Sequence, residues 1–275
     1  MKKLKYVSFV SEIDQQRDYK VVKSNALIQK NRYDLSVQEQ KILLHVIKMI
    51  RPDDTEFAEE YRFSIQDFCR ICGINKSGAN YRDIKACLLS LSKQKWWMTA
   101  ADGSGDEVTA GWIARARISQ GDGTVTLQLD EELKPYLLQL HEYFTKYSLY
   151  YTLTMRSKYS IRLYELFKSY ENLESIELDV NELKKILMAE KYERWADFRR
   201  YCLEGPINEI NKVGDIVVDW TPQKVGRQYQ KIQFSITAKD VMARTETWAE
   251  IEYRLNKNII PGQLSLAMME DLQSN

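Results

Sequence analysis

The chain has 275 residues and a formal net charge of +1, and its hydrophobic fraction of 44% is typical of a globular protein with a buried core. That length allows one large domain or two of ordinary size. No apolar run approaches the roughly 20 residues that span a bilayer, and Met1–Tyr6 is followed by mixed polar residues instead of the apolar core of a secretory signal, so we expect a cytoplasmic protein.

The cysteines argue against both a disulfide scaffold and a metal centre. Four cysteines are too few for a disulfide framework at this length. Cys69 and Cys72 form a CxxC, but they lie in a helical pattern, Ile65–Cys72, where we interpret them as small core residues. A zinc site would need two more ligands, and only His45, His141 and the other cysteines are available. We predict no metal and no cofactor.

The positive charges are concentrated in short stretches, although the total is close to neutral. The first thirty residues are basic, and Lys76–Lys95 contains five cations with one acid, Asp83. The stretch Thr221–Lys231 has no acid and three cations, which are Lys224, Arg227 and Lys231. The C-terminal tail is acidic. Opposed local fields can coexist with a neutral total, so the charge pattern permits a nucleic-acid partner.

In chain order, residues 1–24 are predicted to form a loosely ordered basic segment. A short helix or extended arm follows at Asn25–Ile28. Ser36 and Glu39 then form a capping box, in which each side chain bonds to the other residue's backbone N–H. The helix behind it spaces apolar residues at i, i+3, i+4 and i+7, which are Leu43, Val46, Ile47 and Ile50.

The next segment predicts two helices joined by a tight turn. Tyr61–Phe63 is a short strand, and Ser64 caps a helix over Ile65–Cys72 that Gly73 ends. A longer helix follows from about Ala79 to Lys95. Two helices joined by a short turn that contains glycine form a helix-turn-helix.

A hairpin follows this helix pair. The turn Gly121–Gly123 separates Gly111–Ile118 from Thr124–Leu129, in which Val125, Leu127 and Leu129 alternate with polar residues. A helix-turn-helix followed by a hairpin is a winged helix.

The second half repeats this order of elements. Ser157 precedes a helix with one apolar stripe, made of Leu163, Leu166, Phe167 and Tyr170. Ile176–Val180 alternates as a short strand, and Asp179 and Glu182 cap the helix behind it. A long helix is expected from about Tyr192 to Asn211, with a bend at Pro206.

The last predicted element of this half is a second hairpin. Its strands, Asp215–Trp220 and Gln230–Ile236, flank the segment Thr221–Arg227. Helix, strand, helix, helix and hairpin thus occur twice. We therefore predict an α+β fold with two tandem winged-helix domains: a flexible segment 1–24, domains 25–148 and 149–238, and a C-terminal tail 239–275.

In a winged helix, the second helix of the helix-turn-helix enters the major groove. At about 100° per residue, both candidate helices bury an apolar side and expose cations. In the first helix, one face carries the apolar residues Tyr81, Ile84, Leu88 and Leu91. Arg82 and Lys93 lie on the opposite face, and Lys85 lies on the flank. The second opposes Trp195, Phe198 and Cys202 to Arg200, with Arg194 and Arg199 on the flanks.

These cations can play two roles on DNA. A bidentate arginine–guanine pair gives about 1–3 kcal/mol of discrimination, so Arg194, Arg199 and Arg200 are candidates for base readout, although some would hold phosphates instead. Phosphate contacts, which carry no sequence information, suit Lys85, Lys224, Arg227 and Lys231. The full predicted DNA-binding set is Arg82, Lys85, Lys93, Lys191, Arg194, Arg199, Arg200, Lys224, Arg227 and Lys231. The alternative is that they form solvated faces, but their repeated placement on the groove-facing helix favours DNA.

No catalytic motif stands out. The turn Gly73–Gly78 lacks the GxxxxGK[ST] spacing of a phosphate loop. His45 and His141 are solitary, so the paired-histidine metal site of a nicking enzyme is missing, and His45 reads as a packing residue. The clustered tyrosines read as interdomain packing; they are Tyr143, Tyr147, Tyr150 and Tyr151. We predict that the chain is not an enzyme.

Three blocks of sequence resemble the iteron-binding plasmid replication initiators. The first comprises Asn25–Leu27 and Leu35–Ile42, the second is Leu149–Tyr170, and the third comprises Trp195–Leu203 and Pro206–Asn211. The resemblance runs from about Asn25 to Ile236. It implies tandem winged-helix domains and a bacterial, plasmid-associated protein.

The same resemblance implies a mode of action. Members bind directly repeated origin DNA as monomers with both domains, promote opening of an adjacent A·T-rich segment and recruit host replication proteins, such as a helicase and the host initiator. Many also dimerise through the first domain and repress their own gene. By similarity, Lys191–Lys231 would dominate sequence readout, and the helix that starts near Ser157 would set the orientation of the domains.

Two alternatives to this function remain, along with one hypothesis about the tail. The chain could be a winged-helix transcriptional repressor without initiator activity, or a rolling-circle nickase, which would require metal-dependent strand cleavage. In the tail, Gln263, Leu264 and Leu266 resemble the start of the peptide that binds the bacterial sliding clamp, although Ala267 and Met268 stand where an aromatic residue is usual. The other interpretation is a loose amphipathic tail.

Overall fold

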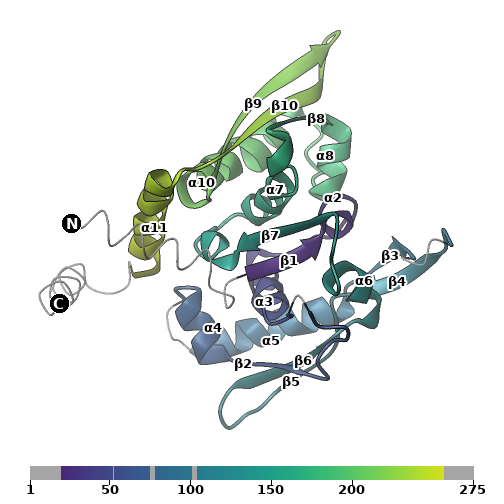
Figure 1. The fold of residues 1–275 in the computed structure, drawn as a ribbon, viewed down its shortest axis with the longest axis vertical. Helices are drawn as coiled ribbons and strands as arrows, with labels where there is room; N and C mark the ends of the chain where they lie inside the picture. Colours follow the sequence, from purple (N-terminus) through teal and green to yellow (C-terminus); the bar gives the residue numbers. More distant parts are fainter. Residues whose placement is uncertain (1–19, 52, 75–77, 101–103, 257–275) are drawn as a thin grey trace, which may run out of the picture.

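The structure is a computed structural model that describes residues 20–51, 53–74, 78–100 and 104–256. Two modules of the same design lie one above the other (Figure 1). A single hydrophobic core extends through both. None of the described helices is long and apolar enough to cross a membrane. The predicted clamp-binding residues, Gln263, Leu264 and Leu266, and the cation Lys76 lie outside the described residues.

The first module follows the predicted order of elements. These are α3 (Val37–Ile47), β2 (Tyr61–Ser64), α4 (Ile65–Ile71), α5 (Gly78–Lys93), β5 (Ile113–Ile118) and β6 (Thr124–Leu129). The three strands form an antiparallel sheet in the order β2-β6-β5, with Phe63 opposite Val125. The helix pair and its hairpin make this module a winged helix.

The second module repeats the arrangement. It comprises α7 (Lys158–Lys168), β8 (Ser175–Asp179), α8 (Val180–Ile186), a helical run from Trp195 to Val213, β9 (Ile216–Val225) and β10 (Gln228–Ala238). Its sheet has the order β8-β10-β9, with Ile232 opposite Leu178. The predicted α+β fold of two tandem winged helices is confirmed.

Other elements surround these modules. They are β1 (Lys20–Ser24), α2 (Asn25–Gln29), β3 (Lys95–Thr99), β4 (Glu107–Gly111), η2 (Glu131–Leu133), α6 (Lys134–Leu137), β7 (Phe144–Ser148), η3 (Leu149–Thr152), η4 (Glu171–Leu173) and α11 (Val241–Asn256). Strands β1 and β7 pair antiparallel, and β3 pairs with β4.

Several predicted boundaries are wrong. Lys20–Ser24 form strand β1 and are not part of an irregular lead, because β7 supplies a hydrogen-bonding partner more than 100 residues away in the chain. Lys95 begins β3 instead of ending α5. The second hairpin is longer than predicted, since the segment Thr221–Val225 continues β9. Pro222 is tolerated there because β9 is an edge strand.

The helix starts predicted from Ser36, Ser64 and Asp179 agree with the structure, whereas the long helix expected from about Tyr192 begins at Trp195. The capping box is present: the Glu39 amide donates to Ser36 Oγ over 3.3 Å, and the Ser36 amide donates to Glu39 Oε2 over 2.7 Å. Ser64 and Asp179 likewise accept backbone hydrogen bonds at the starts of α4 and α8. Gly73 follows α4 with φ of +61°, a conformation that favours glycine.

Replacing Ser36 by alanine should lower the free energy of unfolding by about 1 kcal/mol, because the first turn of α3 loses one satisfied amide. Denaturant titration would measure this as a lower midpoint with an unchanged slope. The matched control is Ser235→Ala, at an exposed position of strand β10, which should change the midpoint little. A Ser36→Ala midpoint equal to the unaltered protein would contradict the cap.

The histidine, cysteine and tyrosine interpretations are largely confirmed. His45 is buried between Phe63 and Phe68, with ring centroids 5.1 and 5.5 Å away, and burial lowers its pKa to about 4. Cys69 and Cys72 are buried core residues, and burial raises the pKa of both thiols, that of Cys72 to about 12. Of the four clustered tyrosines, which were predicted to pack between the domains, three are buried, and Tyr147 packs against Tyr164 of α7. The exception is Tyr143, which is 81% exposed.

A buried ion pair attaches the N-terminal strand to the helix between the modules. Lys23 Nζ of β1 lies 2.5 Å from Glu165 Oε1 of α7, and both side chains are almost fully buried. The Tyr147 hydroxyl of β7 donates to the same oxygen. Nearby, the Arg162 guanidinium lies 4.2 Å from the centroid of the Tyr33 ring. The opposite charges of Lys23 and Glu165 thus compensate each other, as burial requires.

Candidate nucleic-acid interface

The helix expected to read DNA in the second module is a run of three segments. It comprises α9 (Trp195–Phe198), a π-helical segment (Arg199–Glu204) and α10 (Gly205–Val213). Pro206 has no amide hydrogen and would clash with the carbonyl four residues earlier in a regular helix. The wider π segment, with bonds to the fifth residue, lies directly before it. The helix is therefore irregular over the turn that precedes Pro206, and not only at the predicted bend at Pro206 itself.

The inner face of this run packs into the core, and Trp195 links it to the wing. Phe198 and Cys202 are fully buried, as predicted. Trp195, predicted to be buried with them, is only half-buried. Its ring stacks on Tyr229 of the hairpin at 4.7 Å and lies 6.4 Å from Trp220. These contacts hold the hairpin at a fixed angle to the reading helix.

Three exposed arginines lie at the start of this run or directly before it, and they differ in their ion pairs. Arg194 donates to Asp197 over 2.7 Å, and Arg199 donates to Glu204 over 2.7 Å. Arg200 is exposed and forms no ion pair within the described part of the chain. The hydrogen bond from Arg194 and, more weakly, the charge of Arg200 lower the pKa of Asp197. Of the three arginines, Arg200 therefore has the guanidinium group that is most available to bind the edge of a base.

Aromatic rings flank these cations, a feature that the sequence reading missed. Tyr192 and Tyr201 stack at 5.4 Å, and Tyr201 is 49% exposed. Lys191 lies 5.2 Å from the Tyr192 ring, and Arg200 lies 5.6 Å from the Tyr201 ring. A cation and the face of an aromatic ring attract each other. The positive charges of this surface therefore lie close to exposed tyrosine rings. In the sequence, a tyrosine directly follows both Lys191 and Arg200, and this pattern could have predicted the arrangement.

The wing of the second module carries the other predicted cations. Val225 pairs with Gln228, so Gly226 and Arg227 form a two-residue turn, and Gly226 has φ of +65°. Lys224 lies 4.8 Å from the Tyr229 ring, whereas Lys231 is 2.5 Å from Glu177. Arg227 is exposed at the tip of the projecting hairpin (Figure 1). The structure thus gathers the wing cations on the hairpin, with Lys231 already paired.

The first module presents a weaker version of the same surface. In α5, Ile84, Leu88 and Leu91 are buried, while Arg82, Lys85 and Lys93 are exposed, which agrees with the predicted faces. The Arg82 side chain is 80% exposed and lies 3.7 Å from Asp83.

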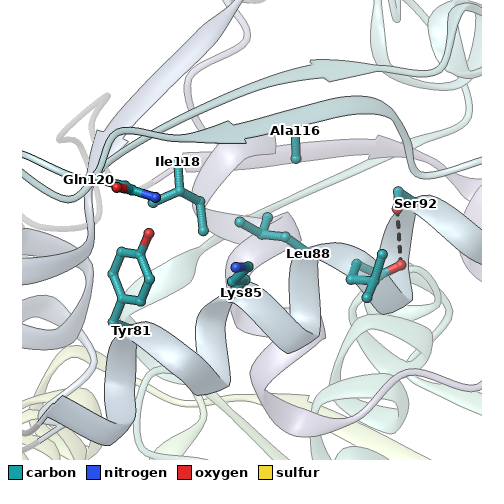
Figure 2. A pocket seen from close by; sticks show the side chains of 8 residues that line it. Tyr81, Lys85, Leu88, Ser92, Ala116, Ile118 and Gln120 are labelled. Atoms are coloured by element: carbon teal, nitrogen blue, oxygen red, sulfur yellow. Dashed lines mark hydrogen bonds between the residues drawn. The ribbon is translucent and has the colours of Figure 1, made fainter.

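A groove of about 290 Å³ separates α5 from strand β5 (Figure 2). Lys85 and Tyr81 line it from the helix, and Ala116 and Ile118 line it from the strand. Two further exposed cations, Arg115 and Arg117, alternate with these strand residues, so they lie on the other face of β5; the sequence reading did not include them.

The described residues form no cluster of metal-binding side chains. Across residues 20–51, 53–74, 78–100 and 104–256, no three His, Cys, Asp or Glu side chains come together in a way that could hold a metal ion. The two modules instead share one arrangement: a helix buried on its apolar side, cations on its outer side and a hairpin beside it.

Family models match both modules. Residues 20–168 match the model described as Initiator Replication protein, WH1, and residues 179–236 match the one described as Initiator Rep protein, WH2. An Escherichia coli protein named "Replication initiation protein" is 25% identical over 242 residues, which cover 84% of this chain and 74% of that protein. An "Uncharacterized 27.6 kDa protein" of Escherichia coli is 24% identical over 233 residues, which cover 80% of this chain and 95% of that protein.

A solved structure shares the whole two-module fold. The crystal structure of Pi initiator protein in complex with iteron DNA superposes with a TM-score of 0.68 at 22% identity, and the match covers 82% of this chain and 99% of that one.

Proposed function

Because the chain belongs to the family of initiator replication proteins, we propose that it starts the replication of a plasmid by binding directly repeated DNA at the origin. The observation that carries this proposal is the repeated surface: each module buries the apolar side of one helix and turns its cations outward, beside a hairpin. A winged helix places that helix in the major groove and the hairpin over the backbone. The Pi initiator protein, which has the same fold, was crystallised with iteron DNA.

The second module supplies most of the sequence readout in this proposal, through Arg200 with Arg194 and Arg199. Lys191, Lys224, Arg227 and Lys231 hold phosphates. The first module adds Arg82, Lys85 and Lys93 on the neighbouring stretch of DNA. Origin opening, recruitment of host replication proteins and repression of its own gene by a dimer are further parts of the proposed role, which takes place in the bacterial cytoplasm and needs no catalysis by this chain.

A replication assay tests the proposal. The gene and its flanking DNA are placed on a circle that has no other origin, and transformants are selected in a bacterial host. Maintenance of the circle is expected, and it should be lost when the gene carries Arg200→Ala together with Arg199→Ala. Repression of the promoter without maintenance of the circle would favour the transcriptional repressor instead.

Arg227→Ala should weaken binding to specific and random DNA by the same factor. A single phosphate contact changes the slope of log K against log salt by about 0.9, so the slope should become shallower by about that amount. Fluorescence anisotropy over a range of salt concentrations measures it. The matched control is Lys134→Ala, since two carboxylates, Glu56 and Glu131, already pair with Lys134. A loss confined to the specific site would show that Arg227 contacts bases.

A further inference from the structure

Helix α11 (Val241–Asn256) lies outside both segments that match the family models. It follows the last strand of the second module and is nevertheless well packed, because Ile251 is fully buried and Trp248 is 8% exposed. In Figure 1 it lies beside α10, above the level of α4. Its contacts reach both modules.

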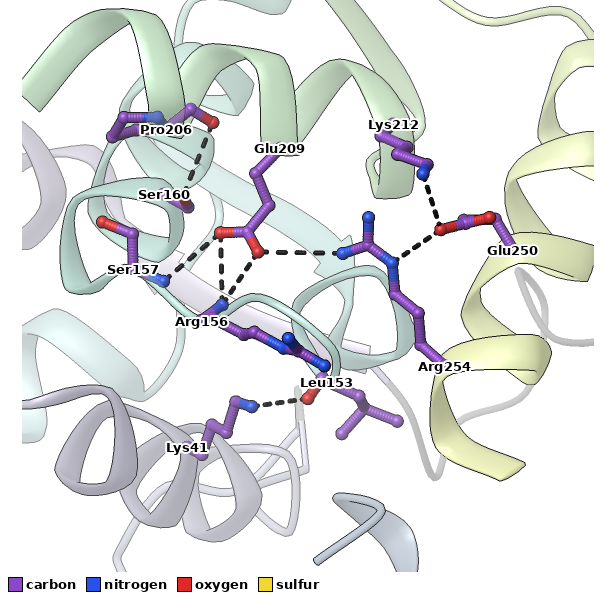
Figure 3. A network of polar contacts seen from close by, with 10 residues as sticks. All are labelled: Lys41, Leu153, Arg156, Ser157, Ser160, Pro206, Glu209, Lys212, Glu250 and Arg254. Atoms are coloured by element: carbon purple, nitrogen blue, oxygen red, sulfur yellow. Dashed lines mark hydrogen bonds and ion pairs between the residues drawn. The ribbon is translucent and has the colours of Figure 1, made fainter. Parts of the chain in front are cut away.

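Charged side chains join α11 to the reading run of the second module (Figure 3). Glu250 accepts from Arg254 over 2.8 Å and lies 3.1 Å from Lys212 Nζ of α10. Arg254 also lies 3.7 Å from Glu209, another α10 residue. Glu209 and Arg254 are largely buried, at 15% and 17% exposure, so their pairing is partly shielded from solvent.

Another face of the same C-terminal half of α11 contacts η3 and the first module. The Tyr150 hydroxyl donates to Glu252 over 2.8 Å. Leu255 lies very close to Gly73, which follows the C-cap of α4. A Cβ on Gly73 would come within 2.9 Å of Leu255 Cδ2 and 3.1 Å of its Cα. A glycine at this position therefore allows both the positive φ and the close approach of α11 to the helix-turn-helix of the first module.

Glu209 also links α11 to the start of the helix between the modules. Its carboxylate accepts from the backbone amide of Arg156 over 3.0 Å and from that of Ser157 over 3.3 Å, directly before α7 (Figure 3). The negative charge is favourable at the beginning of a helix. One carboxylate thus contacts the reading run, the connecting helix and α11.

From these contacts we infer that α11 fixes the angle between the two winged helices and thereby sets the spacing of the two DNA segments that one molecule can bind. This inference rests on the proposed function. One inserted base pair moves the second segment by about 3.4 Å and turns it by about 34°. Two modules held rigidly by α11 cannot follow that change, whereas modules that keep only α7 and the shared core between them, without the α11 contacts, can adapt more easily. Arg254, Glu252 and Leu255 are positioning residues in this account.

Spacing-dependent binding tests the inference. The purified full chain is titrated onto one repeat of its flanking DNA and onto versions with one or two base pairs inserted between the segments that the two modules protect. The unaltered protein should bind the altered DNA on the order of tenfold or more weakly, as expected for rigid coupling. The double variant Glu252→Ala with Leu255→Ala should reduce this penalty to about threefold or less.

Two further variants separate positioning from folding. Glu246→Gln, on the exposed side of α11, should retain the full spacing penalty. Arg254→Gln removes the contact with Glu209 by a single change and should reduce the penalty even if the double variant is unstable. Circular dichroism confirms that each variant is folded.

A full spacing penalty in folded Arg254→Gln and in the folded double variant would overturn the inference. Binding of the unaltered protein that shows no preference for its repeats would instead refute the proposed function.

Discussion

Glu165→Ala should destabilise the protein by about 3–5 kcal/mol, the largest effect that we expect from a single substitution. The change leaves the Lys23 ammonium group buried without its partner, 2.5 Å from the former position of the carboxylate. It also removes the acceptor of the Tyr147 hydroxyl. Strand β1 and helix α7 would then lose the contact that joins them. Denaturant unfolding followed by circular dichroism measures the change in free energy.

Two comparisons make this prediction specific. The triple variant Lys23→Met, Glu165→Leu and Tyr147→Phe should recover most of the loss. Apolar residues of similar volume can replace a buried pair, and no buried hydroxyl is then left without its acceptor. The surface pair of Lys185 and Glu182 provides the control: Lys185→Ala should cost at most about 1 kcal/mol. A loss of that small size for Glu165→Ala would mean that the pair is hydrated in solution.

Arg200→Ala should weaken binding to the specific site by about 10- to 100-fold, which corresponds to about 1–3 kcal/mol for one bidentate contact with a base. Its effect on random DNA should be only a few-fold. The physical reason is that Arg200 is exposed on the reading run and forms no ion pair with any described residue, so its guanidinium is available to a base edge. Anisotropy titrations with specific and random duplexes at one salt concentration measure both effects.

Arg194→Ala is the matched control for this substitution. Arg194 directly precedes the same run but is already hydrogen-bonded to Asp197 over 2.7 Å. This exposed ion pair must break before Arg194 can contact DNA. We expect a smaller specific loss than for Arg200→Ala. Equal losses on specific and random DNA for Arg200→Ala would assign that arginine to a phosphate.

Local signals in the sequence were sufficient for the order of elements and the faces of the helices. Capping residues such as Ser36 and Asp179 act within one helical turn, so their effect can be read from neighbouring residues. Periodic burial likewise depends on spacing alone, which is why Phe198 and Leu88 were placed correctly in the core.

Features that depend on distant partners could not be predicted in this way. Strand β1 exists because β7 pairs with it across more than 100 residues. The half-burial of Trp195 depends on Tyr229 of a hairpin whose angle the sequence does not specify. The π segment before Pro206 reflects a local conflict, but the pattern alone predicted only a bend at that residue. Tyr143 was predicted to be buried because it lies close in sequence to the other tyrosines. Its backbone has a positive φ, and its side chain is exposed to solvent.

A footprint of the purified protein on the DNA that flanks its own gene tests the central claim most directly. If two winged helices bind side by side on tandem sequences, protection should appear over several direct repeats, each wide enough for both modules, beside an A·T-rich stretch. Protection of a single palindrome without repeats, or none at all at physiological salt, would contradict the account.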